Sequence, residues 1–122
     1  MKKELEQELI KTYPNLYSEL RYGFEGIGDG WFLLIEALSK KLETMILALP
    51  EVERLKHRAS QCKSKFATLR FYLSAGTSEM YDAIHEAEAQ SAKTCEKCGR
   101  PGEIRQNNYW IRCECDVCVL LK

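Results

Sequence analysis

The sequence predicts an α+β fold, with a helix-rich N-terminal part, a small β-sheet and a C-terminal module organised by cysteines. Apolar residues recur at helical spacing in much of the first two thirds of the chain, and one segment near the middle alternates as a strand does. Five of the six cysteines lie in the last 28 residues. We therefore expect two units, a helix-rich α+β domain at residues 1–92 and a four-cysteine module at residues 93–122.

The N-terminal segment predicts two short helical pieces and then a loop. A helix is expected at residues 2–12, where two leucines lie one turn apart among charged residues and Pro14 ends the pattern. Residues 13–22 have room for a second helical turn. Four glycines in residues 23–30 predict a loop, because glycine loses more conformational freedom in a helix than any other residue.

The longest helix is expected at residues 31–49, with Asp29 as its N-cap and Pro50 as its end. Its apolar residues recur every three or four positions, which is typical of a helix with one buried face. They are Trp31, Leu34, Ile35, Leu38, Leu42, Met45, Ile46 and Leu49. Residues 51–65 are basic and fit a further helix with a weak end.

A strand is expected at residues 66–73, which alternate in side-chain class and are rich in aromatics. Its predicted core face carries Ala67, Leu69, Phe71 and Leu73. A final helix is expected from residue 78 to about 92, capped by Thr77 or Ser78. Its predicted buried side carries Met80, Ile84, Ala87 and Ser91.

Two C-x2-C pairs define the C-terminal module. Cys95 and Cys98 form the first pair, Cys115 and Cys118 form the second, and 16 residues separate them. This is the spacing of four-cysteine zinc sites. Two thiolates three residues apart on a tight turn can both reach one ion at about 2.3 Å, and two such turns complete a tetrahedron. The sequence therefore predicts one structural Zn²⁺ ion, with no coordination position left open for a substrate.

The alternatives for these cysteines are disulfides or burial without a metal. Charges interrupt the apolar runs near the N-terminus, and no uncharged stretch approaches the roughly 18–20 residues that span a bilayer. A cytoplasmic location without membrane contact is therefore expected, and a reducing compartment favours metal over disulfides. Cys113 offers an alternative ligand, but a C-x-C pair reaches a shared ion less readily, so it is expected to be a spare thiol.

A β-hairpin is expected between the two cysteine pairs. Residues 102–106 and 109–112 flank two asparagines, which tolerate the left-handed conformation of a tight turn. Gly99 directly follows the first pair, where a residue with positive φ helps the chain to turn. Only four residues follow Cys118, too few for the helix of a treble-clef finger, so a zinc ribbon is the expected form.

Charge balance limits the choice of partner. Lysine plus arginine number 18, and aspartate plus glutamate also number 18, which argues against a generic nucleic-acid coat or a polybasic membrane binder. Within residues 51–74, however, six positive charges face two negative ones. The candidate partner-binding residues are Lys63, Lys65, Arg70 and Tyr72 in this stretch, and Arg105, Trp110 and Arg112 in the hairpin. A protein interface and a nucleic-acid surface both fit such a set.

Catalysis is not expected. The only histidines, His57 and His85, each lie in a charged segment predicted to be exposed, and neither has a second histidine nearby. Cys62 stands apart from the other cysteines and is badly placed to pair with His57. No Gly-Lys-Ser/Thr follows the glycine-rich loop, so it is no phosphate-binding P-loop. The sequence shows no convergent set of nucleophile, base and open metal site, so an enzyme is disfavoured.

Three motifs in order carry a resemblance to a known group of proteins. They are Gly28-Asp-Gly-Trp31 at the start of a helix, KFATLRFY from Lys65 to Tyr72, and the CEKCG…W…C-x2-C tail. With them the chain resembles a group of small proteins encoded by tailed phages and prophages, over about residues 24–118. Alanine after Lys-Phe and the extra Cys113 depart from the pattern of that group. The resemblance implies an accessory function in host takeover or in evasion of host defence.

The expected function is therefore that of a non-enzymatic phage or prophage accessory protein in the host cytoplasm. It would carry structural zinc and bind a host protein or protein complex, with inhibition of a defence complex in the manner of an anti-CRISPR protein as one form of this. The alternative is a small zinc-ribbon protein that binds nucleic acid or acts as a regulator. Salt dependence separates the two, because phosphate contacts weaken steeply as salt rises. The sequence leaves the oligomeric state open.

Overall fold

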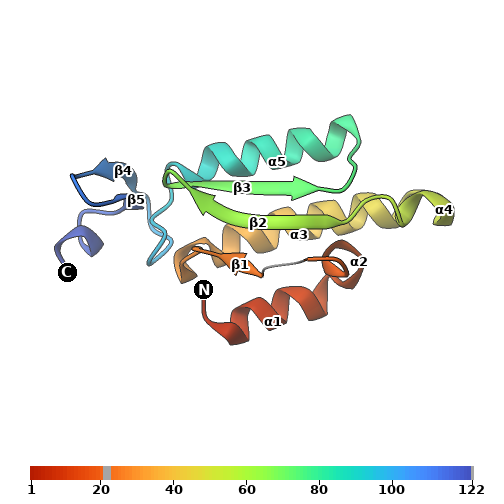
Figure 1. Cartoon of the computed structure of the whole chain (residues 1–122), viewed down its shortest axis with the longest axis horizontal. Coiled ribbons are helices and arrows are strands. Elements are labelled where there is room, and N and C mark those ends of the chain that lie inside the picture. Colours follow the sequence, from red (N-terminus) through yellow and green to blue (C-terminus); the bar gives the residue numbers. More distant parts are fainter. Residues whose placement is uncertain (21–22, 122) are drawn as a thin grey trace.

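The computed structural model describes residues 1–20 and 23–121, and its fold is α+β, as predicted. One sheet packs with helices in the main body, and a second, two-stranded sheet lies in the cysteine module at one end (Figure 1). The helices are α1 (Lys3–Thr12), α2 (Pro14–Tyr17), α3 (Phe32–Leu47), α4 (Glu51–Arg54) and α5 (Ser78–Ser91), with 3-10 turns η1 (Asp29–Trp31) and η2 (Cys118–Leu120). The strands are β1 (Phe24–Glu25), β2 (Ala59–Lys65), β3 (Thr68–Leu73), β4 (Glu103–Gln106) and β5 (Ile111–Glu114).

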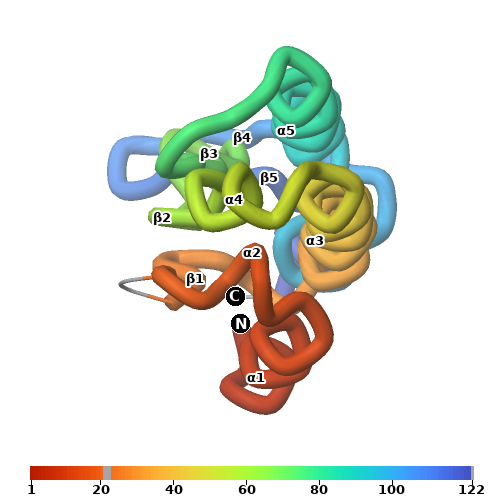
Figure 2. Tube along the Cα trace, turned by 90° about the vertical axis from the view of Figure 1, so that its right-hand side faces the viewer, coloured from red at the N-terminus to blue at the C-terminus, as the bar shows by residue number. Residues whose placement is uncertain are grey.

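The main sheet has the strand order β1-β2-β3, with β1 parallel and β3 antiparallel to β2. Figure 2 shows the sheet on one side of the body and helices α3 and α5 on the other. Side chains of α5 also cover the free edge of β3. The amide of Leu69 donates to Ser91 Oγ at 2.8 Å, and that of Phe71 donates to Glu88 Oε2 at 3.1 Å. This edge is therefore closed to pairing with another strand.

The short helix α2 is tied to the core by aromatic packing and by one buried carboxylate. The ring of Tyr17 lies edge-on to Phe24, with centroids 5.4 Å apart, and its hydroxyl shares a hydrogen bond with Ser39. Burial raises the pKa of Tyr17 well above its usual value. Glu43 of α3 accepts the backbone amide of Leu16 at 2.8 Å, which satisfies a donor at the start of α2.

The central helix is close to the predicted one but begins differently. Five of its eight predicted core residues are buried, and the other three are partly buried against the same core. The prediction of Asp29 as N-cap is wrong, because the 3-10 turn η1 precedes α3 and Asp29 lies inside that turn. Its Oδ1 instead accepts the backbone amide of Lys2 at 2.7 Å, next to the start of α1.

The predictions for residues 51–65 and for the adjacent strand need correction. Only α4 is helical there, and β2 follows, paired with β3 in a hairpin. Phe66 and Ala67 form the two-residue turn with φ of 53° and 66°, so β3 begins at Thr68 and Ala67 is buried in the turn. Positive φ at both positions matches the twist of a tight hairpin. Residue types alone do not predict this turn, since neither residue is the usual glycine or asparagine.

Three further predictions concern the loop at residues 23–30, helix α5 and the helical turn at residues 13–22. The glycine-rich segment 23–30 is mostly loop but contains the short strand β1, which pairs with β2 through Phe24 and Cys62. Helix α5 is confirmed, with Thr77 Oγ1 accepting the amide of Met80 at 3.2 Å. All four residues predicted for its buried side are buried. The second helical turn predicted at 13–22 is α2, and residues 21 and 22 lie outside the described residues.

Candidate metal centre

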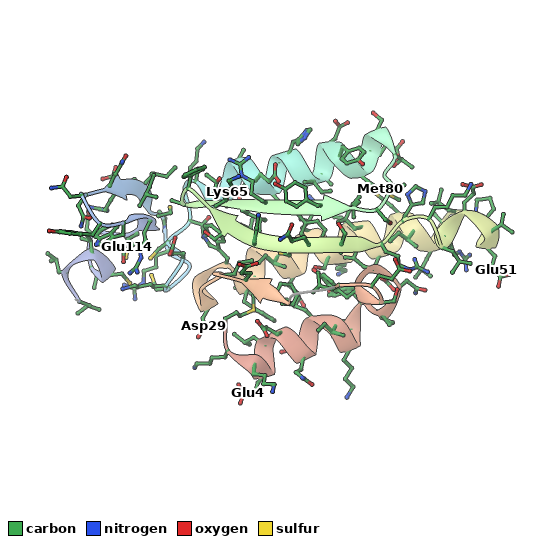
Figure 3. All side chains as sticks on the ribbon, in the orientation of Figure 1. Glu4, Asp29, Glu51, Lys65, Met80 and Glu114 are labelled. Atoms are coloured by element: carbon green, nitrogen blue, oxygen red, sulfur yellow. The ribbon has the colours of Figure 1, made fainter. Side chains whose placement is uncertain are left out.

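The four cysteines of the two C-x2-C pairs converge in the module. The sulfur atoms of Cys95, Cys98, Cys115 and Cys118 all lie within 4.8 Å of one another, and the Cys98 and Cys115 sulfurs are 3.6 Å apart. A tetrahedron with metal–sulfur bonds of about 2.3 Å has edges of about 3.8 Å. These four residues could therefore hold one metal ion with little movement. Figure 3 shows the sulfur atoms, in yellow, gathered inside the module.

Backbone amides prepare part of this group for metal binding. Burial opposes ionisation of Cys95, but hydrogen bonds from the Cys115 amide and from amides of its own turn outweigh burial and lower its pKa. The Cys118 amide donates to the Cys115 sulfur at 3.3 Å and is the main cause of a Cys115 pKa lowered to about 6. Burial, reinforced by the neighbouring thiols, raises the pKa of Cys118 to about 12. The first sulfur of each pair is thus the easier one to ionise, and a cation would favour ionisation of the second.

The turn after the first pair has the predicted geometry. Gly99 has φ of 82°, and its amide donates to the Cys95 carbonyl at 2.9 Å. Gly30 of η1 lies directly beside this turn, since a Cβ added to Gly99 would come within 3.0 Å of the Gly30 carbonyl oxygen. Glycine at position 99 therefore allows both the left-handed backbone and the close approach of η1.

The predicted hairpin between the cysteine pairs is present, with a different turn. Strands β4 and β5 pair antiparallel, and the second strand begins at Ile111 where residue 109 was predicted. The asparagines do not adopt the left-handed conformation, because the described residues other than glycine with positive φ are Phe66 and Ala67. Asn107 acts through its side chain, whose Oδ1 accepts the amides of Tyr109 and Trp110 and so shapes a four-residue loop.

The first cysteine turn packs directly against the start of α3. The Gly30 amide donates to the Glu96 carbonyl at 2.9 Å, and Trp31 Nε1 donates to the Thr94 carbonyl, also at 2.9 Å. A Cβ on Gly30 would overlap the Cys95 carbonyl oxygen, and one on Gly28 would overlap the Glu96 carbonyl oxygen. The Gly28-Asp-Gly-Trp31 motif is therefore the part of the main body on which the first cysteine turn packs. The sequence alone did not reveal this role.

Cys113 lies apart from the four converging sulfurs. It is fully buried in the main hydrophobic core, where its thiol donates to the Ala92 carbonyl at 3.4 Å. Its backbone amide donates to Glu96 Oε2, and burial is the main cause that raises its pKa to about 11. This position agrees with the expectation of a spare thiol, and it adds a contact between the module and the main body.

We predict that Cys113→Ala leaves the metal content of the protein unchanged at one ion per chain. The substitution removes one buried sulfur and a weak hydrogen bond, so the free energy of unfolding should fall by about 1 kcal/mol. Elemental analysis and a thermal melt measure the two effects. Loss of the metal from this variant, with the fold retained, would identify Cys113 as a ligand.

Sequence patterns did not reveal an ion pair next to the cysteines, in which the carboxylate is buried and the lysine is partly exposed. Glu114 is fully buried between two cysteines of the chain, and its Oε2 lies 3.3 Å from Lys97 Nζ, which belongs to the first cysteine turn (Figure 3). The pair joins β5 to that turn. No pattern marked Glu114, because charged residues on a hairpin are expected to be exposed.

The three candidate residues of the hairpin differ in what holds them. Arg105 donates through Nη2 to Asp116 at 2.7 Å and through Nε to the Glu114 carbonyl at 3.0 Å, so it braces the module. The guanidinium of Arg112 lies over the Trp110 ring, 5.5 Å from its centroid. The structure thus brings Trp110 and Arg112 together and binds Arg105 into the module itself.

The remaining candidates lie on the main sheet. Lys63, Lys65, Arg70 and Tyr72 share the face of β2 and β3 that points away from the core. The hairpin candidates belong to the separate β4-β5 sheet, so the seven candidate residues are divided between two sheets.

The histidines and Cys62 also have defined positions. His57 is buried, and its Nδ1 lies 2.8 Å from the Ala75 carbonyl, so its predicted exposure is wrong. His57 lies just before β2, and Ala75 lies just after β3, so the hairpin brings the two together. The helix that was expected for residues 51–65 gave no reason to predict this contact. His85 is exposed on α5. Cys62 is fully buried, and burial raises its pKa, which keeps it a thiol.

The part of the chain that the structure describes includes no helix long and apolar enough to cross a bilayer. Comparisons of the chain with known protein families, with curated proteins and with solved structures found no match.

Proposed function

We propose that this chain is a non-enzymatic accessory protein that docks on a host protein, with its C-terminal module held in shape by a structural zinc ion. The motifs shared with small phage and prophage proteins support a host protein as the target. Inhibition of a host defence complex would be the consequence of docking. Zinc is favoured as the ion because four thiolates at tetrahedral spacing suit it and close its coordination sphere.

The observation that carries the proposal is the apolar surface of the metal-clamped module. Five large apolar side chains of this short segment are exposed: Ile104, Tyr109, Val117, Leu120 and Leu121. Tyr109 is 93% exposed at the hairpin tip and Leu120 is 81% exposed on η2. Exposed apolar side chains concentrated in so short a segment are typical of protein interfaces, and the adjacent Trp110–Arg112 pair adds residue types that anchor them.

A pull-down from host lysate tests the proposal. The wild-type bait should retain a discrete protein after nuclease treatment and carry about one zinc ion per chain, as one closed four-thiolate site requires. A Tyr109→Ser, Leu120→Ser bait should lose that protein while keeping its zinc. The matched control is Val52→Ser, Leu55→Ser, which removes two apolar side chains, 74% and 72% exposed, from the end of the body that carries α4.

Two results would contradict the proposal. Equal recovery by both double variants would show that the module does not make the contact. Recovery that disappears on nuclease treatment would show that nucleic acid bridges the bait and the captured protein.

A further inference from the structure

The outer face of the main sheet has a composition that its role in the fold does not explain. Strand alternation turns Cys62 and Phe71 toward the core, and both are buried. The same alternation turns the cross-strand pair of Lys63 and Arg70 to the outer face. Two more pairs lie on this face, one before and one after that pair along the strands: Gln61 with Tyr72 and Lys65 with Thr68. Helices α3 and α5 lie on the core side of the sheet, as Figure 2 shows, so neither covers the outer face. On that face Lys65 and Tyr72 are exposed, and Lys63 and Arg70 are half-buried.

The cations of this face are not neutralised by the fold. Lys63 and Arg70 lie directly opposite each other, an arrangement of like charges that costs stability. Within residues 1–20 and 23–121, none of Lys63, Lys65 and Arg70 forms an ion pair. Glu25 is the one carboxylate that the described strand residues add to this face, in register with Lys63. The face therefore carries a net charge of +2 (three positive, one negative) and favours an anionic ligand.

Two exposed aromatic rings stand at either end of these cations. Tyr72 is 44% exposed near the end of β3, and Phe66 is 66% exposed in the β2–β3 turn, with Lys65 Nζ 5.6 Å from its ring centroid. From the Lys65–Thr68 pair to the Gln61–Tyr72 pair the strands run four residues, about 13 Å at about 3.3 Å per residue. Aromatic rings separated by a short row of cations suit a strand of a few unpaired nucleotides.

We propose that the outer face of the β1-β2-β3 sheet binds single-stranded nucleic acid. The three cations contact successive phosphates, and bases stack on Tyr72 and on Phe66. Stacking on an exposed ring requires an unpaired base, which favours a single strand over a duplex. A protein strand added to β3 is disfavoured, because Ser91 and Glu88 already occupy its edge amides. This surface is distinct from the apolar module of the proposed function and adds a second binding activity.

Fluorescence anisotropy with labelled 15-nucleotide oligo(dT) and oligo(U) tests the proposal on the full, metal-loaded chain. Binding should weaken with salt with a log–log slope of about −2, the value for three phosphate contacts on a single strand. Affinity for a duplex of the same length should be lower. Tyr72→Leu should weaken binding by roughly tenfold, the effect of losing one stacked base.

Matched charge reversals give the decisive comparison. Lys63→Glu, Arg70→Glu should reduce affinity at least tenfold and flatten the salt slope. Lys40→Glu, Lys41→Glu makes the same charge change at exposed positions of α3 and should have little effect. Circular dichroism checks that both variants fold.

Three results would overturn the assignment to single-stranded nucleic acid. They are an absence of oligonucleotide binding at low salt, equal affinity for the duplex, and equal loss in the two charge-reversal variants. Loss of a captured host protein by the Lys63→Glu, Arg70→Glu bait, with no oligonucleotide binding by the wild type, would assign this face to an acidic protein instead. The apolar module variants separate that outcome from the docking proposal.

Discussion

Removal of the metal ion with a strong chelator is expected to lower the thermal midpoint of the whole chain by more than about 10 °C. The module has little core of its own: its separate buried cluster consists of Cys95, Cys115 and Cys118. Metal binding must supply its folding free energy, on the order of several kcal/mol, and each kcal/mol shifts the midpoint of a domain of this size by about 4 °C. The loss should reach the main body, because the first cysteine turn packs on the start of α3.

The fluorescence of Trp31 can show whether metal removal disturbs the main body. Its ring is fully buried and its Nε1 donates to the Thr94 carbonyl, at the junction with the module. In a Trp110→Phe background Trp31 is the remaining indole. Its emission should shift to longer wavelength on chelation and return when zinc is added back. A Cys98→Ser, Cys115→Ser variant should resemble the chelated protein, whereas Cys113→Ala should resemble the untreated one. An unchanged midpoint and an unchanged emission after complete metal removal would contradict the prediction.

The sequence predicted best those features that depend on local spacing. Helix α5 and the buried stripe of α3 follow from apolar periodicity, and the convergence of the four cysteines follows from two C-x2-C turns. Each of these signals is contained in a short window of the chain. The start of α3 was predicted less well, because the 3-10 turn at Asp29 depends on what packs against it.

The features that the sequence did not predict depend on contacts between distant segments. Strand β2 has few apolar residues, and its two fully buried ones are Ala59 and Cys62. Pairing with β3 therefore stabilises this strand more than its own residue pattern does. Strand β1 is two residues long and exists through its register with β2. The buried Glu114 depends on Lys97, which lies across the module.

Gly30→Ala is expected to be the most damaging single methyl addition in the chain. The new Cβ would overlap the Cys95 carbonyl oxygen and lie 2.7 Å from both the Cys98 amide nitrogen and the Glu96 carbonyl carbon. All three are backbone atoms of the first cysteine turn, which cannot move aside while its cysteines bind one ion. Overpacking of this kind costs about 3 kcal/mol, which a thermal or denaturant melt of the metal-loaded protein would measure.

The control is Gly76→Ala, where the new Cβ would meet the ring of Tyr81 at 2.8 Å. Tyr81 is 40% exposed and can rotate away, so this substitution should cost less than about 1 kcal/mol. The two variants make the same chemical change and differ in what the methyl group meets. Similar melting points for both would show that η1 and the cysteine turn separate easily.

Metal affinity gives the sharper test of the Gly30 contact, because linkage requires the effect to be reciprocal. Suppose that Gly30→Ala lowers the free energy of unfolding by about 3 kcal/mol only while the metal-bound cysteine turn packs on η1. The same variant must then bind zinc about 100-fold more weakly, at 1.4 kcal/mol per factor of ten. Competition with a chromophoric chelator measures this ratio. In the metal-free protein, where the cysteine turn is released, Gly30→Ala should change the melting point little. An equal cost with and without zinc would mean that Gly30 is needed by the start of α3 itself, and that the metal site and the helical body fold independently.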